Sequence, residues 1–305
     1  MKTFETRLFV NKRTRWAGVN SRALLVDPWI VGFVMLTAGA VILALAFAGL
    51  YSVGVLGLLS ESWTTAHWRY VLFESGVWSA LGFSLALTLV TLGLATVAAL
   101  ATVLIVDMRV RRGPFAVLVY APLAVPGIVA ALLSYQILGD AGLLSRMAHA
   151  VGWIRSPAEF PALVFDRLGV GIILTHFAMI TPFFVILFDR LFENERVAEL
   201  RQLAYTLGAT RMQALSRVVL PLLLVRALPV CAVYGVVLMG AFEVPLLIGA
   251  RYPTMISVEI YSRFASYDLT ARPQAYAMAT LYLLLVLAAW SVALRWRPRP
   301  AQTPR

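Results

Sequence analysis

Six apolar segments, each about as long as a lipid bilayer is thick, constrain this chain more than any other feature of its sequence. They cover residues 28–56, 77–106, 114–137, 169–188, 218–248 and 273–294. A hydrocarbon core about 30 Å thick requires roughly 20 apolar residues in a helix. Because lipid offers the backbone no hydrogen-bond partners, spanning segments of this length fold as helices. The sequence therefore predicts an all-α, polytopic membrane protein with six transmembrane helices.

Composition supports this prediction and excludes several classes of function. The chain is 61% hydrophobic and only 13% charged, so a single water-soluble core could not hide its apolar surface. Its net charge of +11 would suit nucleic acid, but the basic residues lie between apolar segments and form no basic face with interleaved aromatics. We expect the lipid bilayer, and no nucleic acid, as a partner.

The distribution of basic residues predicts the orientation in the membrane. Placing both termini in the cytoplasm puts the basic clusters at 2–22, 109–112, 190–217 and 295–305 on the inner side, as the positive-inside rule requires. We divide the chain into a cytoplasmic tail (1–27), a transmembrane domain (28–294) and a basic cytoplasmic tail (295–305). A long basic tail precedes the first apolar segment, so this segment should remain as a helix and not be cleaved as a signal peptide.

The loop at residues 189–217 has a pattern of its own. It mixes acidic and basic residues in nearly equal number, and its apolar residues recur at helical spacing, at Val197, Leu200, Leu203, Ala204 and Leu207. Gly208 follows and can take the positive φ that caps a helix. Thr210 is placed to begin a second short helix that runs to Leu220, and Pro221 marks the entry into the fifth span.

The loop resembles the EAA loop of ABC importer permeases. The matching residues are Gln202-Leu203-Ala204, then Gly208 after three residues, then Val218, Leu220 and Pro221 after nine more. The family's pattern is Glu-Ala-Ala, three residues, Gly, nine residues, Ile, one residue, Leu-Pro. Gln202 and Leu203 depart from it, while Glu199 carries a carboxylate one helical turn earlier. Similar outer-loop features occur at 63–70 and 140–144, the latter before a predicted helix at 143–151, and the resemblance covers about residues 60–290.

This resemblance implies a fold, a set of partners and a location. The fold would be that of a type I ABC importer permease, in which spans two to six form the transport core and span one flanks it. The partners would be two ABC ATPase subunits, a second permease subunit, identical or different, and an extracytoplasmic substrate-binding protein. The location would be the bacterial inner membrane, and the EAA segment would be the helix that couples the ATPases to the spans.

No catalytic residues are predicted in this chain. The phosphate-binding pattern Gly, four residues, Gly-Lys-Ser/Thr does not occur in the sequence. We therefore expect ATP and Mg²⁺ on the partner ATPase subunits and no cofactor here. His67, His149 and His176 have no ligand partners at metal-site spacing, so no metal site is predicted. The alternative from another class is a secondary transporter that needs no ATPase.

Polar residues within the spans are the candidates for a translocation path. Glu243 leads them, followed by His176 and Tyr234, and Pro245 should loosen the helix beside Glu243. Two simpler interpretations stay open for Glu243: a hydrogen bond to the backbone, or an ion pair with Arg251 across the turn. Arg226 is expected to extend toward the inner surface or to form an ion pair there.

The cargo is indicated only by likeness. The run from 242 to 249 and the start of the last span at 272–275 look more like polyamine, iron or phosphonate importers than sugar permeases. A sugar-type importer permease remains the alternative.

Overall fold

The computed structural model describes residues 28–57, 62–105, 117 and 120–295. Within these residues all regular structure is helical. Six stretches are long and apolar enough to cross a bilayer: Pro28–Ser52, Ser75–Ile105, Gly127–Ala150, Val170–Asn194, Arg211–Met239 and Ala271–Ser291. The predicted all-α architecture with six spans is confirmed. The predicted tail at 1–27 and nearly all of that at 295–305 lie outside the described residues.

The centre of the molecule is formed by α4 (Ser75–Ile105), α9 (Val170–Asn194) and α12 (Leu220–Met239). Phe184 and Phe188 of α9 are fully buried in their shared cluster, together with Ala95 and Ala99 of α4 and Leu223 of α12. The two alanines, four residues apart on α4, present small side chains on one face. Small residues let helices approach closely in a membrane, so large rings of α9 fit against α4.

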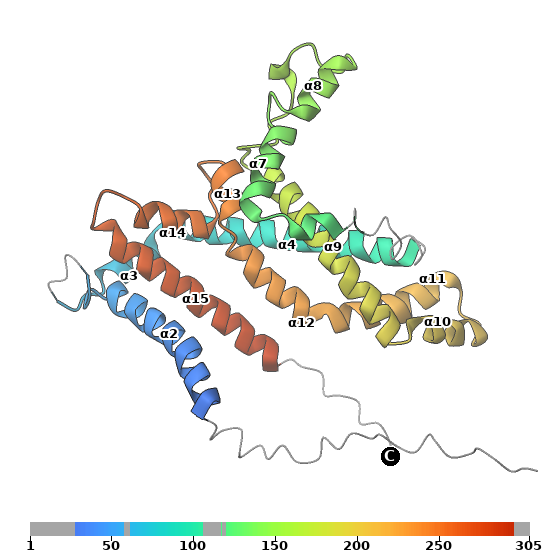
Figure 1. The fold of residues 1–305 in the computed structure, drawn as a ribbon, viewed down its shortest axis with the longest axis horizontal. Helices are drawn as coiled ribbons and strands as arrows, with labels where there is room; N and C mark the ends of the chain where they lie inside the picture. The colour runs from blue at the N-terminus through green and yellow to red at the C-terminus, as the bar shows by residue number, and fades with distance from the viewer. Residues whose placement is uncertain (1–27, 58–61, 106–116, 118–119, 296–305) are drawn as a thin grey trace, which may run out of the picture.

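The first span, α2 (Pro28–Ser52), lies at the edge of the bundle beside α15 (Ala271–Arg295) (Figure 1). None of the most apolar window of α2 is buried, whereas 44% of the corresponding window of α9 is. Apolar side chains in lipid require no protein cover, so this exposure is consistent with a flanking span.

Short helices gather at the two ends of the bundle (Figure 1). At one end, called here the α10 end, lie α10 (Val197–Thr206), α11 (Arg211–Ala214) and the π-helical turn η3 (Leu215–Val219). At the other, called the α13 end, lie α3 (Ala66–Phe73), the 3-10 turn η1 (Ala121–Ala124), α7 (Gly127–Leu138), α13 (Glu243–Ile248) and α14 (Ile256–Phe264). The helix α8 (Leu143–Ala150) and the turn η2 (Pro157–Glu159) belong to an arm that projects beyond α7.

The first, second, fourth and sixth spans agree with the predicted segments, although α9 continues six residues beyond the predicted end at 188. The third predicted segment, 114–137, begins among residues outside the described part, so it stays a prediction. Within the described residues η1 precedes α7, which begins at Gly127, because Pro122 and Pro126 interrupt a regular helix there. The candidate span by length and composition among the described residues is Gly127–Ala150, which joins α7 and α8.

The fifth span differs from the prediction of one helix over 218–248. The helix α12 ends at Met239, the chain is non-helical through Phe242, and α13 begins at Glu243. A helix continuing through Pro245 would lose a backbone hydrogen bond and meet a carbonyl of the preceding turn. Restarting at Glu243 places Pro245 in a first turn, where its missing N–H costs little.

A second correction concerns the second short helix of the loop, predicted to end at Leu220. Instead α11 passes through η3 directly into α12, so residues 211–239 form one continuous helical run. Pro221 again supplies the reason, since it cannot donate to the carbonyl of Arg217. The widened π-helical turn just before it accommodates the missing bond.

Candidate functional site

An ion pair spans the turn from α9 into α10. Arg196, between the two helices, has a left-handed backbone with φ of 51°. Its Nε donates to Oε1 of Glu199 at 2.8 Å, and its second guanidinium nitrogen lies 2.6 Å from Oε2. Both side chains are exposed, so the pair adds well under about 1 kcal/mol to stability. Its role is to orient the first turn of α10.

Two further contacts attach α10 to the spans. Val197, the first residue of α10, is fully buried in the cluster that contains Phe188 and Leu223. Next to it, Glu195 Oε1 lies 2.9 Å from Nε of Arg226 on α12. Arg226 thus forms an ion pair, one of the two expectations from the sequence. A displacement of α10 would therefore act on both α9 and α12.

The far end of α10 turns at Gly208, as the sequence predicts. Gly208 has φ of 84°, its N–H donates to Tyr205 O at 3.0 Å, and the N–H of Ala209 donates to Ala204 O at 3.0 Å. This pair of bonds is a Schellman motif, which satisfies the last carbonyls of a helix. Thr210 then begins α11 with a capping box shared with Gln213.

The apolar stripe predicted on α10 is largely uncovered. Only Val197 is buried, whereas Leu203 is 57% and Leu207 80% exposed, and Met212 on α11 is 70% exposed. The other predicted residues divide between two elements. Glu199, Gln202 and Leu203 are exposed on α10 with Ala204 half-buried, and Val218, Leu220 and Pro221 lie in η3 and at the start of α12. The α10 end thus combines ion-paired charged side chains with exposed apolar side chains.

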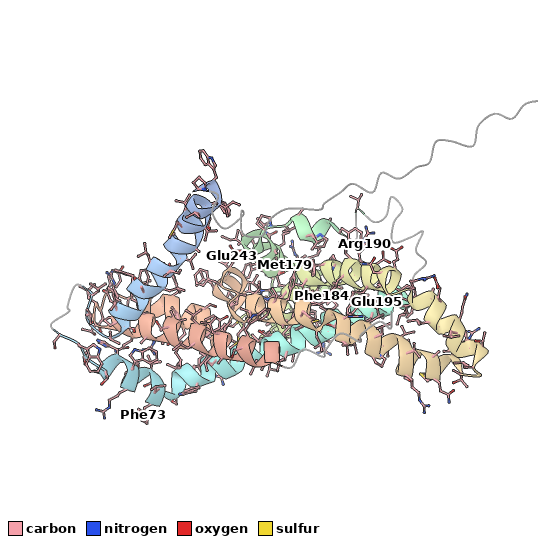
Figure 2. The ribbon with its side chains drawn as sticks, turned by 90° about the horizontal axis from the view of Figure 1, so that it is seen from below. Phe73, Met179, Phe184, Arg190, Glu195 and Glu243 are labelled. Atoms are coloured by element: carbon pink, nitrogen blue, oxygen red, sulfur yellow. The ribbon has the colours of Figure 1, made fainter. Side chains whose placement is uncertain are left out.

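A cavity of about 560 Å³ opens at the α13 end and brings together all three residues predicted for a translocation path. His176 comes from the first third of α9, Tyr234 from α12 and Glu243 from the first turn of α13. The remaining lining is apolar and comes from these helices, η1 and the first residue of α7. In Figure 2, Glu243, Met179 and Phe184 follow one another along the bundle toward Glu195 at the α10 end.

The break between α12 and α13 shapes this cavity. Tyr282 of α15 donates to Val236 O at 3.2 Å, and Ser257 of α14 donates to Ala241 O at 2.5 Å. Ala241 O would face Pro245 in a continuous helix, and proline has no N–H to donate, so Ser257 supplies a donor that the helix could not. Val236 O also accepts from the N–H of Gly240 at 3.1 Å, so Tyr282 adds a second donor to it. Because the break is held in this way, Glu243 is directed into the cavity from the start of a new helix.

Two of the cavity's polar groups have defined surroundings. His176 is buried, and its Nδ1 lies 3.1 Å from Ile172 O. The Tyr234 ring packs on Phe183 and Phe184, with centroid separations of 4.5 and 5.4 Å. Among the described residues the structure gives neither Nε2 of His176 nor the Tyr234 hydroxyl a hydrogen-bond partner.

The Glu243 carboxylate is exposed and lies against the backbone of Gly127, so closely that a Cβ on Gly127 would overlap its Oε2. Neither simpler interpretation of Glu243 is realised in the described part of the chain, where its carboxylate has no ion pair with Arg251 and no hydrogen bond to the backbone. The nearest favourable feature is the N-terminus of α7, whose free N–H groups carry partial positive charge.

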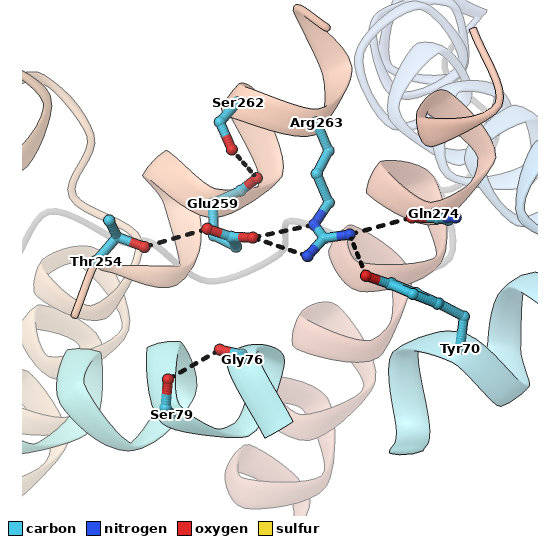
Figure 3. A network of polar contacts seen from close by, with 8 residues as sticks. All are labelled: Tyr70, Gly76, Ser79, Thr254, Glu259, Ser262, Arg263 and Gln274. Atoms are coloured by element: carbon cyan, nitrogen blue, oxygen red, sulfur yellow. Dashed lines mark hydrogen bonds and ion pairs between the residues drawn. The ribbon is translucent and has the colours of Figure 1, made fainter. Parts of the chain in front are cut away.

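Sequence reasoning missed a second polar cluster at the same end (Figure 3). Arg263 on α14 contacts Glu259 at 2.9 Å, Tyr70 of α3 at 2.9 Å and Gln274 of α15 at 3.1 Å. Thr254 donates to the other Glu259 oxygen at 3.3 Å. Burial alone would lower the pKa of Arg263, but its contacts with Tyr70 and Glu259 raise it overall. The four-residue spacing of Glu259 and Arg263 was the available signal.

Comparison with known proteins identifies the fold. No family model and no curated protein matches the chain. A crystal structure of a bacterial ABC transporter involved in the import of the acidic polysaccharide alginate matches with a TM-score of 0.61 and 20% identity, covering 91% of this chain and 96% of that one. A bacterial alginate ABC transporter in complex with an alginate pentasaccharide-bound periplasmic protein matches with a TM-score of 0.59 and 19% identity, covering 90% and 93%. At these identities the likeness establishes the fold of an ABC importer permease.

Proposed function

We propose that this chain is the membrane-spanning permease subunit of an ATP-driven importer, and that α10 is the helix on which a partner ATPase acts. The observation that carries the proposal is the α10 end: a short helix fixed to two spans, with Leu203, Leu207 and Met212 exposed. Exposed apolar side chains within a charged surface are typical of a protein interface.

Orientation follows from the proposal and from the positive-inside rule. The α10 end carries Arg190, Arg196, Arg201, Arg211 and Arg217. A cytoplasmic position for this end places both termini inside as well, because six spans return the chain to its starting side. The α13 end and the arm with α8 then face outward, in a bacterial inner membrane.

The remaining components are other chains. ATP and Mg²⁺ would be bound by two ATPase subunits, whose closure would move α10 and, through Val197 and the Glu195–Arg226 pair, swing α9 and α12 as rigid bodies. A second permease subunit would complete the path. One of the similar structures contains a periplasmic protein with its bound sugar, which supports an extracytoplasmic binding protein for this importer.

Two cargo classes remain candidates from these observations. Likeness in sequence favours a polyamine, iron or phosphonate, and the fold shared with an alginate importer favours a sugar. A type of fold carries many cargoes, so the chemistry of the cavity must decide between them.

The test is a pull-down of the chain from its native membrane in mild detergent. We expect an ATPase subunit to copurify with the wild-type chain and to be lost from a variant carrying Gly208→Val and Glu199→Arg. The control is Glu159→Arg, an exposed carboxylate at the α13 end, which should retain the ATPase. A folded, monodisperse wild-type chain that brings down no ATPase would contradict the proposal and favour the secondary transporter.

A further inference from the structure

The cavity at the α13 end offers acceptors and almost no donors to a bound molecule. The lining side chains that ionise or form strong hydrogen bonds are His176, Tyr234 and Glu243, and the lining includes no lysine or arginine. Its volume of about 560 Å³ lies in the range that holds a small organic ligand. The charge and hydrogen-bonding capacity of these three groups therefore determine the class of ligand.

Glu243 supplies a negative charge that the described protein does not neutralise. By contrast Glu259, on α14 at the same end, is engaged by Arg263 and Thr254. Glu243 has no such cation among the described residues, and its carboxylate lies against Gly127 at the N-terminus of α7. An ionised group in a membrane-embedded cavity is costly and marks a functional site.

His176 supplies a second acceptor. Its Nδ1 contacts the carbonyl oxygen of Ile172, and a carbonyl can only accept, so Nδ1 carries the proton. In the neutral ring Nε2 is then a lone-pair acceptor. The Tyr234 hydroxyl, without a partner among the described residues, accepts equally well, and its ring extends an aromatic cluster with Phe183.

We propose that this cavity receives a cargo bearing ammonium groups, with Glu243 as counter-ion and His176 Nε2 and the Tyr234 hydroxyl accepting N–H bonds. An ammonium group needs this combination of a nearby anion, acceptors and aromatic surface. A phosphonate or an acidic sugar would bring negative charge against Glu243 and find no basic donor. The inference rests on the proposed importer function and gives it a cargo class, an organic amine.

A metal ion fits the same cavity poorly. One carboxylate and one imidazole provide fewer protein ligands than metal sites ordinarily use. No group of three or more His, Cys, Asp or Glu side chains in the described chain could hold a metal. The geometry thus favours an organic cation, for which one counter-ion and a few acceptors suffice.

Binding of putrescine and spermidine to the purified chain, with whatever subunits copurify, tests this assignment. Phosphatidylcholine nanodiscs avoid amine binding to anionic lipid, and titration calorimetry gives the dissociation constant. We expect at least one amine to bind the wild-type chain and to bind Glu243→Gln roughly tenfold or more weakly, the loss expected for a charge-assisted hydrogen bond. Methylphosphonate and maltotriose should bind neither.

Two further variants separate charge from structure. Gly127→Ala keeps the charge but displaces the Glu243 carboxylate, so it should also weaken amine binding. Asp268→Asn removes an exposed carboxylate elsewhere on the chain and should leave the affinity unchanged. If neither amine binds wild type more tightly than Glu243→Gln, the proposal is overturned.

The amine-binding measurement and the ATPase pull-down can fail separately. Glu243→Gln should still copurify with the ATPase, because Glu243 and α10 lie at opposite ends of the bundle. Retained ATPase with unchanged amine affinity would refute the cargo class alone. Amine binding by the wild-type chain that Glu243→Gln weakens, in a chain that captures no ATPase, would refute the ATP-driven importer and leave the amine assignment of the cavity standing.

Discussion

The α10 end exposes apolar side chains, whereas the cavity at the α13 end contains a charged side chain without an oppositely charged partner among the described residues. At the α10 end the acids Glu195 and Glu199 are paired with arginines, and the apolar residues Leu203 and Leu207 are exposed. In the cavity Ile180, Leu238 and Val244 are buried, and the Glu243 carboxylate has no cation partner among the described residues. Exposed apolar surface suits a protein partner, and an unneutralised charge suits a small polar ligand. The contrast indicates what each end binds.

The largest expected effect is at Gly208. Replacement by valine should abolish ATP-driven uptake while leaving membrane insertion intact, because a β-branched residue strongly disfavours φ of 84°. A Cβ at this position would meet no other atom, so the effect comes from the backbone conformation and not from a clash. Uptake by proteoliposomes that contain the copurified complex measures it.

Gly208→Asn is the matched control, since asparagine tolerates the left-handed conformation. It should retain a large part of the uptake. Equal loss in both variants would show that the glycine turn is not the feature through which the α10 end acts.

The next largest effect concerns the Arg263 cluster. This cluster lies at the same end as Glu243, but its charged side chains have partners. Arg263→Met leaves Glu259 with only Thr254 and removes the links to Tyr70 and Gln274. We expect a loss of about 1–3 kcal/mol in stability, less than for a fully buried pair because both side chains retain some exposure. Glu259→Gln should cost less, since Arg263 keeps two partners.

Thermal unfolding in detergent, followed by the intrinsic tryptophan fluorescence, compares these two variants with wild type. Amine affinity of the folded fraction should not change in either, because neither residue lines the cavity. A tenfold change in affinity would mean that the Arg263 cluster belongs to the binding site.

The sequence predicted the α10 end better than the cavity, and the reason is physical. The structural roles of Gly208, Thr210 and the periodic apolar residues of α10 involve only neighbours a few residues away in the sequence. Rules for local sequence patterns therefore identify them. The break before Glu243 has a local signal in Pro245, but the side chains that donate hydrogen bonds around it, Ser257 and Tyr282, are distant in sequence. Likewise, the position of Pro221 indicated that the second short helix of the loop would end there. It did not indicate that a π-helical turn would keep the helix continuous.

The residues of the cavity were identified singly, and only the fold brings them together. Glu243, His176 and Tyr234 were chosen because polar groups in apolar segments are rare. Nothing in the sequence places the first residue of α7 against the Glu243 carboxylate, a contact between residues more than one hundred positions apart. Composition also did not predict that η1 would precede α7, where Pro122 and Pro126 interrupt an apolar stretch that composition alone suggests is one continuous helix.

A smaller effect is expected for the ion pair between Glu195 and Arg226. Arg226 is more than half exposed, so the pair should contribute less than about 1 kcal/mol to stability. Its larger consequence should be in coupling: Arg226→Met should lower the number of cargo molecules transported per ATP hydrolysed more than it lowers the apparent melting temperature. A double-mutant cycle with Glu195→Gln measures the interaction, and additive effects on coupling would contradict a transmitting role for the pair.

The smallest expected effect on stability is that of Glu243→Gln. This variant tests most directly whether the charge in the cavity, unlike the charges at the α10 end, lacks a partner. The wild-type carboxylate has no cation partner among the described residues, so its removal should change stability by less than about 0.5 kcal/mol or stabilise the chain slightly. The reason is that the carboxylate is exposed and that no ion pair with a described residue is lost. The apparent melting temperature, measured without amine, provides the test. A destabilisation above about 1 kcal/mol would identify the carboxylate as a cap on the N-terminus of α7, and the cavity would then resemble the α10 end in having its charges satisfied from within.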